Sequence, residues 1–504
     1  MYSVVVAFGL ASIMICIGLA LRGKIRFFQK MLMPVSVIAG IIGFAFVNLV
    51  IANVDIAGVT VGDFSAIVDV FFVLSFISIG LTGGKKKSKN NTDKADNTAN
   101  NKKNNSAVKG AVGMGLVWCM LYAITPIIGI AIVFLIGNLF GMNPMYGILI
   151  PFAFCQGPGQ ASTYGKLFEG TYGFPNAEMV ALSFAVFGFL AAFLLGVPLA
   201  KYGMKKGLGR NKSKLSEVVE RGYFLPEEQR ETIGKSTTHS ANIESVAVHF
   251  AIMGVCYCLA VILSKIIYVI PVLGSTFSAM LFFWGMIAAY IVKGIMRKLN
   301  IDYLINNAFQ GRVTGFLSDY LVVCAFMAIQ LTVIGSWIIP IAIVSAVCAV
   351  VTIVVCVFFG ARFGSDHDFE RVLGLYGTCT GTTPSGISLV RMIDPKLQTS
   401  TGNELGMMNI AMMFSTPTMI FITFAGLQSI SLVVACVGMF VTIILYMICL
   451  KVFRVWKKPT FSFKNGVMHN GEDDNEDIPF LKGILKDIEE SDSAIIGSGL
   501  GSYK

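Results

Sequence analysis

Long apolar stretches separated by short polar connections dominate this chain. Most are long enough, or nearly so, to cross a bilayer as a helix, which takes about 20 mainly apolar residues. A segment in lipid must satisfy its own backbone hydrogen bonds, so helices are predicted. The pattern therefore predicts an all-α polytopic membrane protein. The candidate spans are Val4–Leu21, Met33–Ile51, Val68–Gly83, Val112–Phe140, Met179–Ala200, Val246–Ile267, Val272–Val292, Val313–Leu331, Val333–Phe359, Asn409–Gly426 and Ile430–Leu450.

Two motifs occur twice. Asp69–Leu81 aligns with Asp319–Leu331 at an offset of 250, with five identities in thirteen positions. Cys155–Ser162 aligns with Cys379–Gly386 at an offset of 224, and the offsets agree once the 26-residue polar insert 84–109 is removed. Each half holds five predicted spans and one Gly/Pro/Thr-rich segment, so the odd number of crossings inverts the second half. The chain is predicted to contain two inverted-topology repeats of five transmembrane helices, each with a re-entrant hairpin, plus one extra C-terminal helix.

The repeats set the predicted organisation of the chain. The insert is rich in Asn, Lys and Asp and has too few apolar side chains to build a core, which predicts disorder. The predicted parts are a first repeat at 1–206 with a disordered cytoplasmic insert at 84–109, a cytoplasmic connector at 207–243, a second repeat at 244–427, an extra helix at 428–452 and a cytoplasmic tail at 453–504.

The chain has a net charge of +10, and the positions of its basic residues indicate the topology. Basic residues cluster after alternate spans, whereas the connections Ala52–Ile67, Gly141–Met145 and Thr332–Ser336 contain no Lys or Arg. This positive-inside pattern predicts a multi-pass protein of the cell inner membrane with its N-terminus outside and its C-terminus in the cytoplasm. The charge then points to the lipid bilayer as a partner and not to nucleic acid. Asp69 is expected to begin its helix on the outside, and Asp319 to begin its helix near the inside.

Catalytic and metal-binding motifs are missing from the sequence. The eleven cysteines fall mostly in apolar segments and include no CxxC pair, and the four histidines form no zinc or haem pattern. No Ser/His pair and no phosphate-binding loop of the Walker type is present, which argues against an intramembrane enzyme and an ATP-driven pump. We predict a protein that is not an enzyme and carries no cofactor other than a coupling ion.

The two Gly/Pro-rich segments are the candidate binding site. Gln156–Gln160 reads Gln-Gly-Pro-Gly-Gln, which breaks a helix, and Gly377–Gly386 repeats the design with Thr, Gly and Pro. Freed carbonyl groups suit sodium, and N–H groups at a restarting helix suit a carboxylate. The candidate substrate-binding residues are Gln156, Gly157, Gly159, Gln160, Ser162, Thr382, Thr383, Ser385 and Arg391, and the candidate sodium ligands are Thr378, Thr380, Asp69, Asp319 and Asn409.

Some of these assignments have a second interpretation. Arg391 could pair with a substrate carboxylate or serve as a positive-inside anchor at the hairpin mouth. Asp69 and Asp319 could bind sodium, or instead cap a helix or form an ion pair. The small residues of both hairpins could also serve only to let helices pack closely.

The same residues resemble the bacterial sodium/glutamate symporter family. Gly165–Asn176 is similar to the family's SKLF…YGF-x-N sequence, and Ile79–Leu81 is another match. Gln156–Gln160 stands at the position of the family's Gly-rich first hairpin, and Gly381–Ser385 resembles its GxGATPTA-like second hairpin. Pro34–Val37 departs from the usual Pro-Glu-Pro-Val, and Gln156–Gly159 replaces the usual Gly-Gly-His-Gly tip.

The resemblance covers roughly Met31–Gly83 and Gly110–Gly426. It implies a sodium-coupled elevator in which a hairpin-bearing domain slides against a scaffold that forms a homodimer. The leading hypothesis is sodium-driven import of glutamate or a similar small carboxylate. The alternatives are a sodium-coupled citrate or dicarboxylate carrier of related architecture, and a passive channel.

Overall fold

The computed structural model describes residues 2–82, 94–210, 218, 221–225, 228, 232–270, 274–395, 397–408, 414–464 and 466–468. In the first half of the chain the helices are α1 (Tyr2–Lys24), α2 (Arg26–Lys30), α3 (Val35–Phe46), η1 (Val47–Ile51), α4 (Val61–Thr82), α5 (Lys94–Ile136), η2 (Gly137–Phe140), η3 (Pro144–Leu149), α6 (Ile150–Phe154), α7 (Pro158–Gly170) and α8 (Ala177–Lys205).

The second half of the chain is also built from long and short helices. Its elements are α10 (Ser245–Tyr268), α11 (Gly274–Ala279), α12 (Leu281–Lys298), η4 (Asp302–Leu304), α13 (Asn307–Met327), α14 (Leu331–Ile334), η5 (Gly335–Trp337), α15 (Ile338–Gly360), α16 (Asp368–Thr380), α17 (Thr383–Ile393), α18 (Thr401–Met408), α19 (Thr416–Gly426), α20 (Leu432–Val452), β1 (Phe461–Ser462) and β2 (Gly466–Val467).

Long apolar helices confirm the predicted class of protein. Within the described ranges, seven helices are long and apolar enough to cross a membrane: α1, α4, α5 from Ala107 with η2, α8, α10, α14–α15 and α20. Helices α12 and α13 were also expected as spans but carry more polar residues, such as Lys293 and Gln310. The protein is an all-helical polytopic membrane protein, apart from the short β1–β2 pair.

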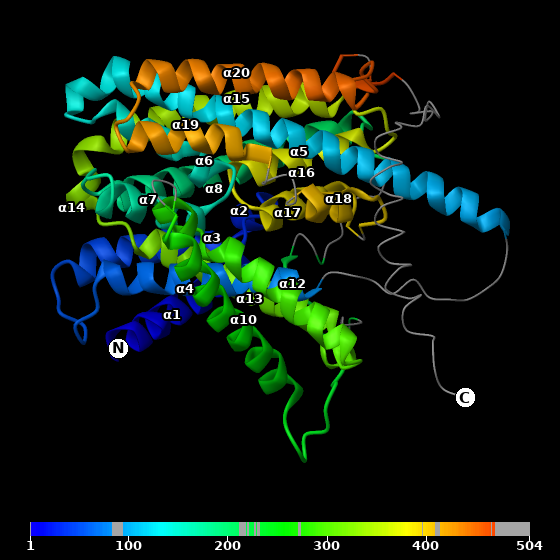
Figure 1. The fold of residues 1–504 in the computed structure, drawn as a ribbon, viewed down its shortest axis with the longest axis horizontal. Helices are drawn as coiled ribbons and strands as arrows, with labels where there is room; N and C mark the ends of the chain where they lie inside the picture. Colours follow the sequence, from blue (N-terminus) through cyan, green and yellow to red (C-terminus); the bar gives the residue numbers. More distant parts are fainter. Residues whose placement is uncertain are drawn as a thin grey trace.

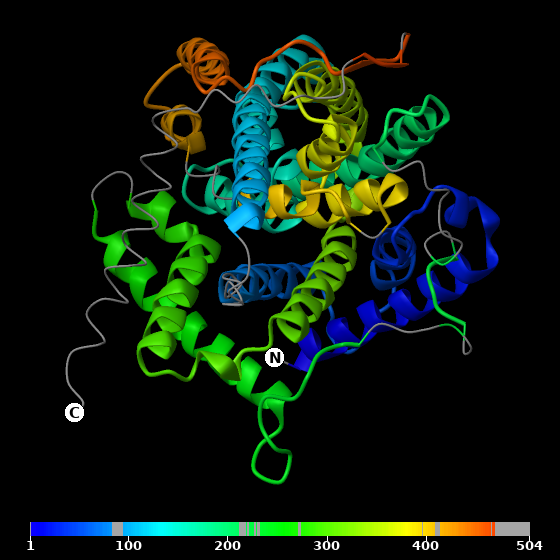
Figure 2. The ribbon, with the colours of Figure 1, turned by 90° about the vertical axis from the view of Figure 1, so that its right-hand side faces the viewer.

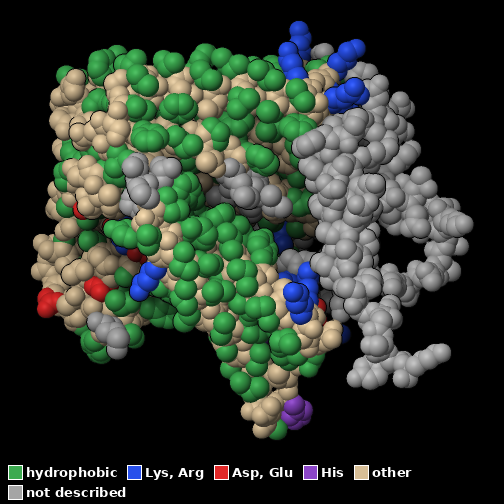
Figure 3. Space-filling model, viewed as in Figure 1, with side chains coloured by type: hydrophobic (Ala, Val, Ile, Leu, Met, Phe, Trp, Pro, Cys, Tyr) green, Lys and Arg blue, Asp and Glu red, His purple; other side chains and the backbone are tan. Residues whose placement is uncertain are grey.

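The helices form two groups, which Figure 2 shows end-on. The companion group contains α1, α3, α4, α10, α12 and α13, where α4 packs against α12 and α13, and α3 packs against α1 and α13. The hairpin group contains α5–α8 and α15–α20 (Figure 1), with α5 lying between α15 and α20 (Figure 2). Apolar side chains cover much of the visible surface, and Lys and Arg gather beside the C-terminal end of α20 (Figure 3).

Local sequence explains where several helices begin. The side chain of Asn306 accepts a hydrogen bond from the Phe309 N–H at 3.0 Å and caps α13. Ser431 caps α20 in the same way through Val434 at 3.3 Å. Pro158 and Pro384 lie in the first turns of α7 and α17, where a missing N–H leaves no helical bond unmade.

The structure corrects the expected positions of two acidic residues. Asp69 lies near the middle of α4, which begins at Val61, and Asp319 lies in the second half of α13, which begins at Asn307. Neither residue begins or caps its helix. The apolar run starts near each Asp, but the helix continues through the polar residues before it. Hydropathy therefore placed both helix starts too late.

Two polar segments contain secondary structure that composition did not indicate. Helix α5 begins at Lys94, inside the insert 84–109, while residues 83–93 lie outside the described part of the chain. Disorder of the insert stays a prediction. In the tail, β1 and β2 form an antiparallel pair in which Phe461 is opposite Val467.

A glycine contact joins α5 to the start of the first hairpin segment. A Cβ on Gly129 would lie 2.1 Å from Ile150 Cδ1 and 2.4 Å from the Gly147 carbonyl oxygen. Small residues of this kind let membrane helices approach closely.

We expect Gly129→Ala to lower the apparent melting temperature of the detergent-solubilised protein, because overpacking typically costs about 1–3 kcal/mol. Gly254→Ala in α10 is the matched control, since a Cβ there meets nothing within 4 Å. Thermal unfolding followed by intrinsic fluorescence measures both. Equal melting temperatures for the two variants would contradict this packing.

Candidate functional site

Two helical hairpins carry the Gly/Pro-rich motifs. Hairpin 1 consists of residues 144–170, in which α6 ends at Phe154 and α7 restarts at Pro158. Gly157 between them has φ +85°, a conformation that glycine adopts without strain. Hairpin 2 consists of residues 368–393, in which α16 and α17 pack together and are separated by Gly381 and Thr382.

The tips of the two hairpins touch. A Cβ on Gly157 would lie 2.6 Å from Thr382 Cγ2 and 3.0 Å from the Gly381 carbonyl oxygen, so only glycine fits without a shift. The Trp118 indole N–H of α5 donates a 2.9 Å hydrogen bond to the Cys155 carbonyl and ties the end of α6 to that helix. The two predicted breaks are therefore in direct contact.

A cavity of about 100 Å³ lies beside the tips, between the two helix groups. Its walls come from both hairpins, α5, α4 and α13. The lining residues are Phe72, Ser75, Phe76, Ile79, Trp118, Cys155, Gln156, Pro158, Gly159, Thr314, Ser318, Leu321, Val322, Thr378, Thr382, Thr383 and Pro384. None of these is Asp, Glu, Lys, Arg or His, so the described wall offers hydroxyl, amide and backbone groups but no charged side chain.

Helix ends supply the electrostatic character of this cavity. Pro158 and Gly159 belong to the first turn of α7, and Thr383 and Pro384 to the first turn of α17. Two positive helix ends therefore lie at the wall, which favours an anion. Thr378 belongs to the last turn of α16, whose carbonyl end favours a cation. One small space thus presents both polarities.

Two glutamines have polar atoms that lack a partner among the described residues. They are Oε1 of Gln156, which lines the cavity, and both amide atoms of Gln160, whose side chain is fully buried. A buried amide without a partner is unfavourable and calls for an explanation. A polar ligand at the hairpin tips would supply one for Gln156.

A cluster of charged and hydroxyl side chains links hairpin 1 to the companion group. Lys166 of α7 forms an ion pair with Asp69 of α4 and lies 3.5 Å from Glu178 of α8. The Ser162 hydroxyl lies within hydrogen-bonding distance of both carboxylates, 2.9 Å from Asp69 Oδ1 and 2.7 Å from Glu178 Oε1, and the Ser65 hydroxyl donates to Glu178. Sodium binding, helix capping and an ion pair were the possible roles of Asp69, and in this structure it forms an ion pair.

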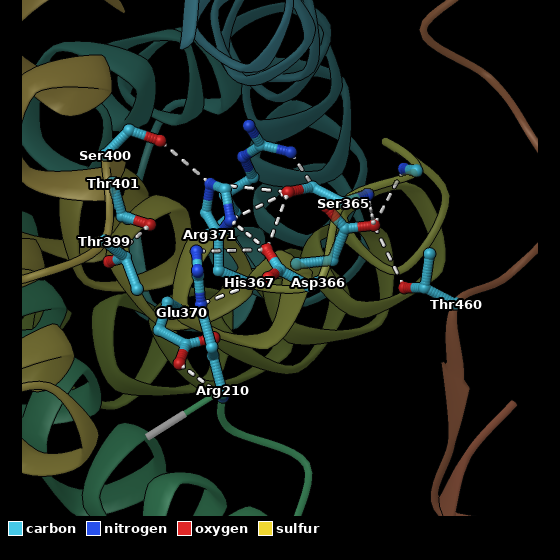
Figure 4. A network of polar contacts seen from close by, with 12 residues as sticks. Arg210, Ser365, Asp366, His367, Glu370, Arg371, Thr399, Ser400, Thr401 and Thr460 are labelled. Carbon is cyan, nitrogen blue, oxygen red and sulfur yellow. Dashed lines mark hydrogen bonds and ion pairs between the residues drawn. The ribbon is translucent and has the colours of Figure 1, made fainter. Parts of the chain in front are cut away.

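A second network lies at the base of hairpin 2 (Figure 4). The Arg371 guanidinium donates to Glu404 in bidentate fashion at 2.8 and 2.7 Å and to Asp368 at 2.9 Å, all of it buried. Asp368 also accepts from the Thr460 hydroxyl at 3.0 Å, and Ser400 donates to Glu404 at 2.6 Å. Paired and hydrogen-bonded, these buried charges hold α16, α18 and the tail together.

His367 joins this network from the loop before α16. Its Nδ1 lies 2.8 Å from Asp366 Oδ1, and its Nε2 lies 3.4 Å from Glu404 Oε1. Burial disfavours the protonated ring, but the hydrogen bonds with Asp366 and Glu404 outweigh it and raise the pKa of His367 above its ordinary value. The hydrogen bond with His367 lowers the pKa of the Asp366 carboxyl.

The structure brings most of the sequence-predicted site residues to the hairpin tips. Gln156, Gly159, Thr378, Thr382 and Thr383 line the cavity. Three others lie at the tips but outside the lining: Gly157 against Thr382, Ser385 with its hydroxyl 3.4 Å from that of Thr382, and Thr380, whose hydroxyl donates to the Tyr376 carbonyl.

Four of the predicted residues, Ser162, Asp69, Arg391 and Asp319, lie away from the cavity. Ser162 belongs with Asp69 to the cluster on α4, α7 and α8. Arg391 is exposed near the C-terminal end of α17, at the far end of that helix from the cavity. Asp319 is hydrogen-bonded to Ser36 of α3. Asn409 lies outside the described residues.

Several wall residues were not identified from the sequence. Trp118 was missed, as were the hydroxyl residues that α4 and α13 contribute to the wall: Ser75, Thr314 and Ser318. The sequence marks these three residues only as hydroxyl side chains within apolar helices. Such residues are common in membrane helices, so they do not indicate a site. Glu178, beside the start of α8, was missed as the second carboxylate facing Lys166.

Two helix breaks that meet inside an all-helical membrane protein are typical of one class of protein. This class is the transporters, which carry small solutes across membranes. Comparison with known families agrees with this class. The model of the family described as "Sodium/glutamate symporter" matches residues 106–399, more than half of the chain. The chain therefore belongs to the sodium/glutamate symporter family, which is a family of multi-pass membrane transporters and not of enzymes.

Curated relatives resemble the chain over a shorter part. The sodium/glutamate symporters of Escherichia coli (strain K12) and Shigella flexneri are each 24% identical to it over 259 residues. The match covers 51% of this chain and 61% of each relative. The chain thus spans less than two thirds of the length of these relatives.

The pKa of His367 makes a pH dependence testable. A raised pKa means that the protonated ring stabilises the folded protein; this contribution is fully present below the ordinary value of 6.5 and is lost as pH rises through the higher folded value. The charged groups in contact with the ring are Asp366, Glu404 and Arg371, which keep their charges over this range. Glu370 also acts on the ring, and because burial raises its pKa to about 7 it titrates in the same range in both proteins, so the comparison with His367→Gln isolates the ring. Wild-type protein should lose melting temperature between about pH 6 and pH 8, and His367→Gln should lose less. Parallel pH profiles for the two proteins would contradict this assignment.

Proposed function

We propose that this protein is a secondary transporter that imports glutamate, or a similar small carboxylate, together with sodium. The contact between the two hairpin tips, beside a cavity that contains hydroxyl and amide side chains and two helix N-termini, carries the proposal. In this assignment the N-terminal ends of α7 and α17 bind the carboxylate, and the carbonyl end of α16 contributes to the sodium site. The side chains of Gln156, Thr382 and Thr383 orient the substrate, and Thr378 lies on the sodium side.

The order of helices supports two inverted repeats. Helices α1, α3, α4 and α5, hairpin 1 and α8 have counterparts in α10, α12, α13 and α15, hairpin 2 and α18–α19. The packing is matched as well: α4 packs on α12 as α13 packs on α3, and α1 packs on α3 as α10 packs on α12. With helix α20 added, we place the N-terminus outside and the C-terminus in the cytoplasm of the cell membrane.

The position of the cavity supports an elevator mechanism. Its walls come from the hairpin group on one side and from α4 and α13 of the companion group on the other. Movement of the hairpin group past the companion group would carry a bound solute from one face of the membrane to the other. The ion pair between Lys166 and Asp69 joins the two groups and would have to open for this movement. The companion group is then the scaffold, through which the protein forms a homodimer as the resemblance implies.

Charge in the cavity bears on the choice of substrate. No Lys or Arg side chain belongs to the described wall, so helix ends and a bound sodium ion must balance the anion. Glutamate carries one net negative charge, whereas a dicarboxylate carries two and citrate three. The wall therefore favours glutamate over the more highly charged citrate and dicarboxylates.

Uptake by proteoliposomes tests the function. We expect radiolabelled glutamate to accumulate under an inward sodium gradient, to be displaced by unlabelled glutamate, and not to accumulate when potassium replaces sodium. Equal accumulation in sodium and potassium would contradict symport. Accumulation of citrate but not glutamate would overturn the substrate, and unsaturable flux would indicate a channel.

Two variants test the site in the same assay. Gln156→Ala and Thr383→Ala should each raise the apparent KM for glutamate about tenfold, since a hydrogen bond to a charged group contributes about 1.5–3 kcal/mol. Ser388→Ala is the matched control, because its exposed hydroxyl donates to the Pro384 carbonyl on the same helix as Thr383. Unchanged KM values for both glutamate and sodium in the two site variants would overturn the assignment.

A further inference from the structure

The first residues after α20 fold back over the end of α15. We call residues 453–464 and 466–468 the strap. Its backbone is anchored by hydrogen bonds from the Lys457 N–H to the Arg362 carbonyl and from the Thr460 N–H to the Ala361 carbonyl, both 2.8 Å. Phe461 packs edge-on against Phe369 of α16 at 5.5 Å between ring centroids. The strap is therefore a defined part of the structure.

A large apolar cavity lies between the strap, α15 and α8. Its volume is about 660 Å³, within the range of roughly 300–1,000 Å³ that small-molecule sites occupy. Leu199, Ile353, Val357 and Phe358 form one wall, and Phe461 and Phe463 of the strap form the other. The space is open on one side, so it is a groove at the surface of the protein and not a packing defect in its interior.

The cavity opens toward the hydrocarbon side of a spanning helix. Val354 and Phe358 of α15 line it and are 59% and 42% exposed. Because α15 belongs to a helix that is apolar and long enough to span the membrane, this exposed face meets lipid chains. Apolar walls of this kind favour an apolar occupant such as a lipid acyl chain.

One basic residue lines the same cavity, and more follow one another along the strap. Arg362 is the one charged residue in the described lining, and its guanidinium carbon lies 3.9 Å from the Phe358 ring centroid. Residues 451–468 contain five Lys or Arg and no Asp or Glu. Figure 3 shows Lys and Arg side chains gathered beside the end of α20. The nearby carboxylates are engaged elsewhere, Asp366 with Arg210 and Asp368 with Arg371.

We propose that this cavity binds an anionic phospholipid of the cytoplasmic leaflet. An acyl chain occupies the apolar cavity, and the phosphate lies at Arg362 with the basic strap around it. Basic pockets at the cytoplasmic ends of membrane helices favour anionic headgroups. A soluble anion would leave the apolar walls uncovered, and a zwitterionic lipid would gain less from the basic surroundings. Thr460 bonds to Asp368, so a lipid that holds the strap in place also supports the base of hairpin 2.

Native mass spectrometry of the full-length protein in detergent tests the proposal. The probes are phosphatidylglycerol and phosphatidylcholine with identical acyl chains. We expect one phosphatidylglycerol to be retained at lower lipid concentration than phosphatidylcholine. Arg362→Gln should weaken phosphatidylglycerol binding about fivefold, the effect of one basic residue near a membrane surface. Lys298→Gln, which removes an exposed charge at the end of α12, should change nothing.

A second pair of variants tests the cavity itself. Val357→Phe adds an aromatic ring inside the cavity, narrows the space for an acyl chain and should weaken retention of the lipid, whereas Val347→Phe, on the same helix but outside the lining, should not. Equal retention of the two lipids would overturn the proposal, and so would retention unaffected by Val357→Phe. Retention of neither lipid, the result if the acidic residues 472–477 of the tail occupy the strap instead, would overturn it as well.

Discussion

The structure depends on how backbone groups are satisfied where helices break inside the membrane part of the chain. Lipid offers no hydrogen-bonding partner, so a break is tolerated only against protein or a polar cavity. Here the breaks at Gly157 and at Gly381–Thr382 lie against each other. The contact shields both tips from lipid and leaves their helix ends at the wall of one small cavity. The features that support solute binding follow from this arrangement.

Charged side chains are kept away from that space. Lys166, Asp69 and Glu178 compensate one another between α7, α8 and α4, and Arg371 is compensated by Glu404 and Asp368 at the base of hairpin 2. The charges of Arg371, Asp368 and Glu404 are buried, and buried charges are costly unless paired. The pairing lets the cavity wall stay free of ionised side chains, so that sodium and a carboxylate would provide the charges for each other. Tight coupling of two ligands is a natural result of such a site.

Sequence patterns predicted the hairpins because helix breaking has a local cause. Pro158 and Gly157 reveal a break whatever surrounds them, and Pro384 does the same in the second hairpin. The contribution of α4 and α13 to the cavity wall could not be predicted in this way. Ser75 and Ser318 are single hydroxyl residues on apolar helices, and only the packing of those helices against the hairpins places them at the cavity.

Hydropathy also misplaced features that depend on tertiary contacts. The starts of α4 and α13 were set too late, because a helix can continue through polar residues when neighbouring helices accept them, as Glu178 accepts the Ser65 hydroxyl. The strap was treated as part of a polar tail, since a two-stranded pair held by Phe461 and Thr460 leaves little trace in composition. Arg391 looked suited to a carboxylate by residue type, but its place on α17 puts it at the end of the helix far from the cavity.

The central claim is that solute and sodium bind at the hairpin tips, and Trp118 reports on that place directly. Its indole lines the cavity and donates to the Cys155 carbonyl. We expect glutamate to cause a saturable change in intrinsic fluorescence of the purified protein in sodium but not in potassium. Trp118→Phe should abolish the change, and Trp337→Phe, which alters a residue bonded to the Phe140 carbonyl instead, should retain it. A sodium-dependent change that persists in Trp118→Phe would contradict the account.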